Sequence, residues 1–331
     1  PTPEPTPAPT PAPTPEPTSA AQTASTKWPA AGETVSLTAA QVVAAGETFD
    51  GGMKKYERSD LTCDQAKDAT SADAVFIVQP GGVLKNVVIG DKNILGVVCA
   101  EQNCVLESVW SDGVCQAALQ VEKSVGTTSI TGGGAKGATQ RVVFHKGGGT
   151  VKVSNYYTEG CSKLVESCAT CGPVKRTISV AGVEVLHPVG PLVSVNKNYK
   201  DVATIDGVKA ITTTGTMEVC VHMDGGKTPT QVSTGEAEGL CSYSSSGVQI
   251  LGYLWWDREP PGSKQPQRVS ILDRHTSAIN RVVVILWQSF DSRSLFHSQP
   301  AAAYCRALQT RPKPKEDTTG RSIKATAGLL P

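Results

Sequence analysis

The residues in this sequence whose types and spacing could do chemistry begin with Cys168 and Cys171, which are separated by Ala and Thr. In an intracellular protein this spacing is typical of a redox dithiol or of one half of a zinc site. A zinc site needs a second Cys or His pair at ligand spacing, and a redox dithiol is expected beside a βαβ unit. The sequence offers neither, so we interpret the cysteines as disulfides formed in an oxidising compartment.

The histidines and the other cysteines support the same interpretation. His145, His187 and His222 stand at no metal spacing from one another, so we expect turn or surface residues rather than ligands. Cys220 and Cys241 are placed to link a closing loop at 217–251. The chain has ten cysteines in all: Cys63, Cys99, Cys104, Cys115, Cys161, Cys168, Cys171, Cys220, Cys241 and Cys305.

The overall composition favours a β protein with many turns. The 331 residues include 32 Gly, and only 5% are aromatic, which disfavours a helical bundle. No apolar run approaches the roughly 20 residues of a membrane span. The formal net charge is +1, and its basic excess lies in a tail without a recognisable binding motif. We therefore expect neither a nucleic-acid nor a membrane partner.

Composition also divides the chain into three segments. Residues 1–26 are rich in Pro and Thr, and proline at alternate positions removes backbone donors, so we expect a disordered linker. Residues 27–251 form the body. Residues 252–331 share no pattern with it, and we expect either a disordered C-terminal extension or translated non-coding sequence from a gene model. Because the chain opens at Pro1, we take it to be a mature or partial form, so a missing signal peptide does not argue against secretion.

The elements that must position any site recur at a regular interval. Short apolar runs return every 22 to 27 residues, separated by Gly, Asn, Ser and Cys. A repeat of this length with several strands in each turn is typical of a parallel β-helix, in which stacked coils bury a continuous aliphatic column. The sequence therefore predicts an all-β protein built as a parallel β-helix. The apolar positions expected to be equivalent are Leu84, Leu106, Ile130, Val153, Ile178 and Ile205.

Several collinear motifs in the body resemble a known family, the third polysaccharide lyase family of secreted microbial pectate lyases. The resemblance covers roughly residues 45–250 and includes the cysteine pattern. The family fold is a right-handed parallel β-helix, in agreement with the repeat. The motifs are TFDGGMKKYER (48–58), ADAVFIVQPGGVLKNVVIG (72–90), SVW-x-x-x-VC (108–115), GGGA (132–135), HKGGGT (145–150) and SKLVESCATC (162–171).

The resemblance implies a reaction and its partners. It implies β-elimination of de-esterified polygalacturonate in pectin: a base removes the proton beside the sugar carboxylate, and the bond to the next sugar oxygen breaks. Ca²⁺ as cofactor would bridge protein and substrate carboxylates, because it prefers six to eight oxygen ligands. Lys and Arg side chains would neutralise the remaining charge. The resemblance further implies a secreted, extracellular protein, and we expect it to act as a monomer.

The family residues carry over only in part. Lys163 is kept in the SKLVESCATC motif, and a positive charge survives at Arg141, where the family has an Asp-Lys pair that reads Gln140-Arg141 here. Both are predicted to serve in catalysis and in substrate binding. Asp112 is the acid that remains in the motif ending at Cys115, and it is the candidate metal ligand.

Four positions depart from the family pattern. Leu95, Gln116 and Ala117 replace carboxylates that the resemblance assigns to calcium. Their loss removes about three negative charges, and calcium affinity depends on the charge of its ligands. Glu166 replaces an Arg and could pair with Lys163 or Arg141.

Three hypotheses follow from this pattern. The first is an active pectate lyase that uses Lys163 and Arg141 with an altered metal site. The second is a paralogue impaired in catalysis, which binds pectin or another partner without cleaving it. The third is a purely structural module, of a cell wall or for adhesion, and the Pro-Thr spacer supports it.

Overall fold

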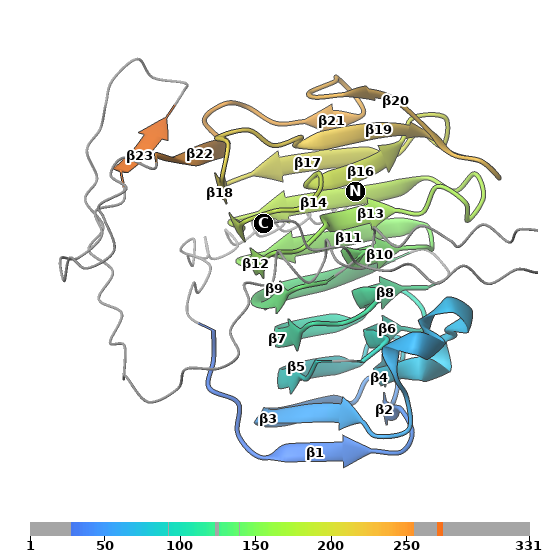
Figure 1. Ribbon diagram of the computed structural model, residues 1–331. Helices are drawn as coiled ribbons and strands as arrows, with labels where there is room; N and C mark the ends of the chain where they lie inside the picture. The colour runs from blue at the N-terminus through green and yellow to red at the C-terminus, as the bar shows by residue number, and fades with distance from the viewer. Residues whose placement is uncertain (1–27, 92, 123–125, 139, 255–269, 274–331) are drawn as a thin grey trace, which may run out of the picture. The chain divides into compact units, whose positions relative to one another are not determined.

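The computed structural model of the protein defines residues 28–91, 93–122, 126–138, 140–254 and 270–273 (Figure 1). Within them the chain winds into successive coils whose parallel strands stack in two sheets. The prediction of an all-β parallel β-helix is confirmed. The predicted linker at 1–26 and most of the predicted tail at 252–331 lie outside the described residues.

Successive coils contribute strands to both sheets. Sheet B consists, in stacking order, of β2 (Gln41–Val43), β4 (Ala74–Val78), β6 (Leu95–Cys99), β8 (Ala117–Val121), β10 (Arg141–His145), β13 (Lys163–Ser167), β16 (Val193–Asn196), β19 (Cys220–Asp224) and the antiparallel β20 (Thr230–Thr234). The main path of sheet A consists of β1 (Thr34–Leu37), β3 (Thr48–Arg58), β5 (Val83–Ile89), β7 (Val105–Asp112), β9 (Thr127–Lys136), β12 (Tyr157–Glu159), β15 (Glu184–Leu186), β18 (Val208–Thr212), β22 (Val248–Leu254) and β23 (Ser270–Asp273). Its branch consists of β11 (Gly149–Ser154), β14 (Arg176–Ala181), β17 (Val202–Asp206) and β21 (Cys241–Ser242).

A bend divides the long strands of sheet A. Asn86 of β5 and Ser108 of β7 have φ of 54° and 53°, and Gly132 of β9 has φ of 65°. This left-handed conformation suits Gly and Asn and turns the chain sharply. The three residues occupy equivalent places on successive coils, because their preceding neighbours Lys85, Glu107 and Thr131 are in register. Each bend therefore starts a second face of the coil.

The stacking register confirms most of the predicted apolar column and corrects one member. Leu84, Leu106, Ile130 and Val153 pair in succession. Val153 then pairs with Val180, which pairs with Ile205, whereas the predicted Ile178 pairs with Val151. The shift is two residues, so Ile178 still points into the core, because side chains alternate with a period of two.

Three disulfides join the described residues: Cys63–Cys115, Cys168–Cys171 and Cys220–Cys241. The disulfide interpretation of the close Cys168–Cys171 pair and the expected link across the closing loop are both confirmed. Cys63–Cys115 spans 52 residues, and it attaches a short helical segment to the stack. Cys305 lies outside the described residues.

That segment contains two 3-10 helices, η1 (Cys63–Asp68) and η2 (Ser71–Asp73). The residue just before each helix donates a backbone hydrogen bond to the side chain of the residue three positions later. The Gln65 Oε1 accepts a hydrogen bond from Thr62 N, and the Asp73 Oδ2 accepts one from Thr70 N, both at 2.6 Å. In the described part of the chain, no helix is long and apolar enough to cross a membrane.

Two histidines are buried, contrary to the expectation of turn or surface positions. His145 is 0% exposed at the end of β10, and His222 is 2% exposed on β19. They occupy inward strand positions with polar partners, and His145 Nε2 lies 3.2 Å from Gly148 O. His187, just after β15 with φ of 50°, is the turn residue that the sequence predicts.

Burial lowers the pKa of His145 to about 4, below its ordinary value of about 6.5. The unfolded chain therefore binds more protons between these two values, so the free energy of unfolding should fall as pH drops from about 6.5 to 4, by up to about 3 kcal/mol. Urea unfolding across this range measures the slope. His145→Gln should flatten it. A slope that His145→Gln leaves at its wild-type value would contradict the assignment.

Candidate active site

Four of the positions singled out by motif form one column on the outward side of sheet B. Leu95 of β6 pairs with Ala117 of β8, Ala117 pairs with Arg141 of β10, and Arg141 pairs with Lys163 of β13. Adjacent strands of a sheet lie about 4.8 Å apart. The fold therefore brings residues from four coils into one row, with two apolar side chains followed by two cations.

Glu166 joins the two cations. Its Oε2 accepts a hydrogen bond from Lys163 Nζ at 2.9 Å. Arg141 Nε lies 2.9 Å from the same oxygen, but its N–H is not aimed at it, so this contact is an ion pair only. The Arg141 guanidinium also lies 4.0 Å from the centre of the Phe144 ring. The three charged side chains are 18–29% exposed, which leaves them accessible to a ligand.

The apolar half of the column is covered. Leu95 and Ala117 are each 1% exposed. They belong to a buried cluster with Ala74, Ile94 and Val98, against which Leu61, Ala66 and Ala69 from the segment around η1 pack. Figure 1 shows the blue helical turns of this segment beside β4 and β6. Two of the calcium positions that the resemblance implies, Leu95 and Ala117, are therefore apolar and shielded from solvent.

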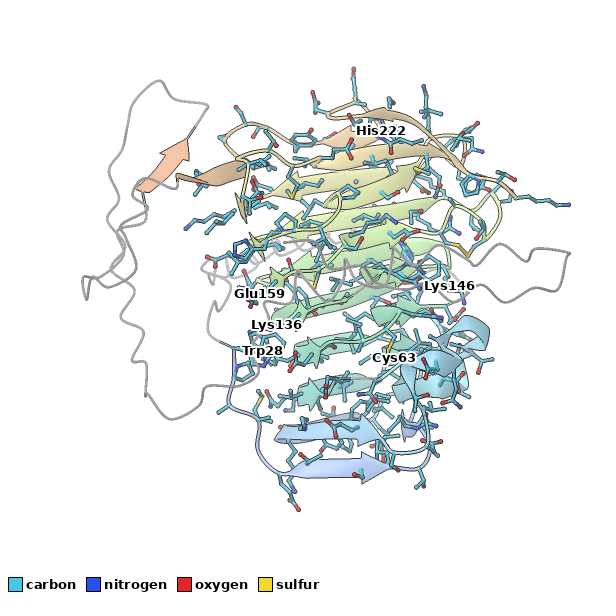
Figure 2. All side chains as sticks on the ribbon, viewed as in Figure 1. Trp28, Cys63, Lys136, Lys146, Glu159 and His222 are labelled. Atoms are coloured by element: carbon cyan, nitrogen blue, oxygen red, sulfur yellow. A yellow bond between two sulfur atoms is a disulfide. The ribbon has the colours of Figure 1, made fainter. Side chains whose placement is uncertain are left out.

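Two bonds hold the η1 segment in place over this cluster. The amide of Gln116 donates a hydrogen bond to Ala66 O. The neighbouring Cys115 forms the disulfide to Cys63, which is labelled in Figure 2 beside sheet B. Gln116 thus binds the covering segment through its donor group.

Asp112 lies apart from Arg141 and Lys163. It ends β7 on sheet A, where it is in register with Lys136. Lys136 pairs with Glu159 at 3.0 Å and lies 4.6 Å from the Trp28 ring centre, and Figure 2 shows these three labels together, on the side away from Cys63. Partial desolvation raises the pKa of Asp112, and Lys136 opposes that rise. The structure therefore places this acid in an ionic row of sheet A.

Among the described residues, one group of three metal-binding side chains has its ligand atoms within 4.8 Å of one another: Cys220, His222 and Cys241. Its two sulfur atoms form a disulfide. The ring nitrogens of His222 lie 2.8 Å from Ser233 Oγ and 3.0 Å from Gly235 O. This group is therefore occupied by structural contacts, and no cluster of three carboxylates occurs in the described part of the chain.

The contribution of the η1 segment was missed from the sequence. The only signal was Cys63, whose partner could not be chosen among the nine other cysteines. The pairing of Glu166 was foreseen as one of two options, Lys163 or Arg141. The structure shows both contacts at once.

Comparisons with known proteins bear on this site. The sequence model of the family described as Pectate lyase matches residues 25–229. The chain is 41% identical over 204 residues to pectate lyase H of Emericella nidulans, an alignment that covers 60% of this chain and 76% of that protein. It is 37% identical over 222 residues to a probable pectate lyase E of Aspergillus clavatus, which covers 65% and 84% of the two chains.

Solved structures show the same fold. The pectate lyase PelI from Erwinia chrysanthemi, solved in complex with tetragalacturonic acid, is 25% identical with a TM-score of 0.50 and covers 66% of this chain and 70% of that one. The pectate lyase Pel3 from Pectobacterium carotovorum is 23% identical with a TM-score of 0.52, covering 72% and 73%.

Leu95→Asp tests whether the apolar half of the column is covered. The substitution should lower the free energy of unfolding by roughly 2–4 kcal/mol, because it buries an unpaired carboxylate beneath the η1 segment. Val42→Asp, on β2 of the same sheet where the valine is 51% exposed, is the matched control and should change little. Urea unfolding compares the two, and equal stabilities would show that Leu95 faces solvent.

Proposed function

This chain belongs to the pectate lyase family, and we propose from this premise that it cleaves α-1,4-linked polygalacturonate by β-elimination at the Arg141–Lys163 pair. The observation that carries the proposal is the register of these two cations on adjacent strands of sheet B. They lie close enough together to contact one sugar carboxylate. Cations at this position favour the negative charge that develops beside the carboxylate in the transition state.

The reaction assigned to the pair is an elimination. One of the two side chains, in its neutral form, takes the proton from C5 of the galacturonate. The electron pair of that C–H bond forms the C4=C5 double bond, and the bond from C4 to the glycosidic oxygen breaks. The same side chain returns the proton to the leaving oxygen. The other side chain remains a cation and holds the sugar carboxylate.

Pectate lyases are generally calcium-dependent, but the residues of this column do not fit calcium. Calcium takes six to eight oxygen ligands, mostly from carboxylates. Leu95 and Ala117 offer none, and the donor amide of Gln116 binds Ala66 O. Glu166, the carboxylate nearest the column, already contacts Arg141 and Lys163. We therefore assign no step of the elimination to a metal.

A second candidate function is binding of pectin without cleavage, and Glu166 specifically favours it. Its Oε2 contacts both Arg141 and Lys163, so neither side chain is left without a partner to act as a base. Oligogalacturonate would then bind along the column and leave uncleaved. Retention on pectate gels without release of unsaturated product distinguishes this function from the lyase.

The proposed setting is extracellular, with the protein acting as a monomer on pectin. Three disulfides within the described residues support an oxidising compartment. Polygalacturonate as the partner is supported by the relatives named pectate lyases.

Lys163→Ala should reduce kcat/KM on polygalacturonate by about a hundredfold or more, because the variant removes a group that transfers the proton or stabilises the developing charge. The absorbance of the unsaturated product follows the reaction. Lys152→Ala, which removes an exposed lysine from β11 on sheet A, should retain wild-type activity. Equal activities of the two variants would remove Lys163 from the site.

Calcium is tested by binding as well as by rate. Because the column lacks carboxylate ligands, calcium at millimolar concentration should leave the unfolding temperature unchanged, and a chelator should leave the elimination rate unchanged. Magnesium at the same concentration controls for ionic strength. A calcium-specific rise in unfolding temperature, or a loss of rate with the chelator, would contradict the assignment.

A further inference from the structure

The outward surface around Arg141 and Lys163 carries little net charge. Glu166 contacts both cations, so the three side chains together leave a single positive charge. On the neighbouring strands, Phe144 and Ser194 are in register with Glu166, and both are uncharged. A galacturonan chain that crosses these strands at Arg141 and Lys163 therefore also passes the Glu166 carboxylate.

Lys146 and Glu122, two further charged residues at the ends of strands of sheet B, add no net charge. Lys146 and Glu122 form an ion pair at 2.6 Å. Glu122 also accepts hydrogen bonds from Gln120 at 2.6 Å and from Ser71 at 3.1 Å. Lys146 therefore does not replace the positive charge that Glu166 neutralises in the column.

A fully charged polygalacturonate is poorly matched to this surface. Each of its sugars carries one carboxylate, and a carboxylate beside Glu166 is repelled by a like charge. A calcium ion would offset that repulsion, but Leu95 and Ala117 supply no ligand for one. A sugar without a charge avoids the conflict entirely.

We propose that Glu166 selects galacturonan whose sugar at this position is methyl-esterified, an inference that rests on the proposed lyase function. The ester removes the negative charge that Glu166 repels. Its methyl group can contact the half-buried Phe144 ring, which lies next to Glu166 on the adjacent strand. Partially esterified chains are therefore better substrates than fully de-esterified ones.

Esterification also suits the chemistry of a site without calcium. When C5 of a free galacturonate loses its proton, a second negative charge forms beside the carboxylate. When C5 of the methyl ester loses its proton, the resulting carbanion carries one negative charge in total. The single net positive charge of the cluster can balance it. The electron pair then forms the C4=C5 bond, the glycosidic oxygen leaves with the proton, and the ester remains intact.

The experiment compares two galacturonans of equal length, one fully de-esterified and one about half methyl-esterified, with a chelator present throughout. Absorbance of the unsaturated product gives kcat and KM for each. The wild type should favour the esterified chain by about tenfold in kcat/KM, the effect of about one like-charge contact. Glu166→Gln should improve kcat/KM on the de-esterified chain, chiefly through KM, and remove most of this preference.

Glu107→Gln is the matched control, because it removes an exposed carboxylate from β7 on sheet A. It should leave the preference at its wild-type value. A wild type that favours the de-esterified chain, or a preference that Glu166→Gln does not change, overturns the proposal while leaving the lyase function intact.

Absence of product from both chains would instead overturn the proposed lyase function. Affinity gel electrophoresis in each galacturonan then tests the charge preference by itself. Stronger retention of the wild type by the esterified chain, reduced in Glu166→Gln, supports selection by Glu166. Equal retention in both gels refutes it.

Discussion

The structure depends on one constraint, the in-register stacking of parallel strands. Each residue of a coil lies beside its equivalent in the next coil, at the spacing of strands in a sheet. In the core this produces the column from Leu84 through Leu106 and Ile130. On the outside of sheet B it produces the row from Leu95 to Lys163. One geometric rule therefore supplies both the stability of the solenoid and the alignment of its candidate site.

Stacking also makes the site sensitive to single substitutions. A carboxylate on one strand is a direct neighbour of the side chains on the strands beside it, as Glu166 is to the strand that carries Arg141. Apolar residues in the same row pack together and attract a covering segment, as Leu95 and Ala117 do. The same scaffold can thus hold a row of charges or an apolar cluster, depending on which residues occupy the row.

The covering of Leu95 and Ala117 joins two physical effects. Burial of apolar surface favours contact between the η1 segment and the cluster. The Cys63–Cys115 disulfide then restricts the segment to this position by closing a long loop. Together they convert positions at which the family resemblance implies metal ligands into part of the hydrophobic interior, while Arg141 and Lys163 stay accessible two strands further along.

The sequence by itself determined the fold class, and it singled out four positions that the structure aligns in one row. Apolar residues returned at near-constant intervals, and motif order along the chain became strand order in the stack, because each coil pairs with its neighbours. It misplaced Ile178 by two residues, since coil lengths vary where β11 leads into β14. It also placed His145 and His222 in turns or at the surface, because spacing alone does not show which side chains of a coil point inward.

Only the tertiary structure decided how the row is charged and covered. It placed one oxygen of Glu166 against both cations, and Asp112 on the other sheet. It also put η1 over Leu95 through contacts between residues about fifty positions apart in the chain. Such contacts depend on side-chain directions and loop paths, which a repeat pattern does not specify.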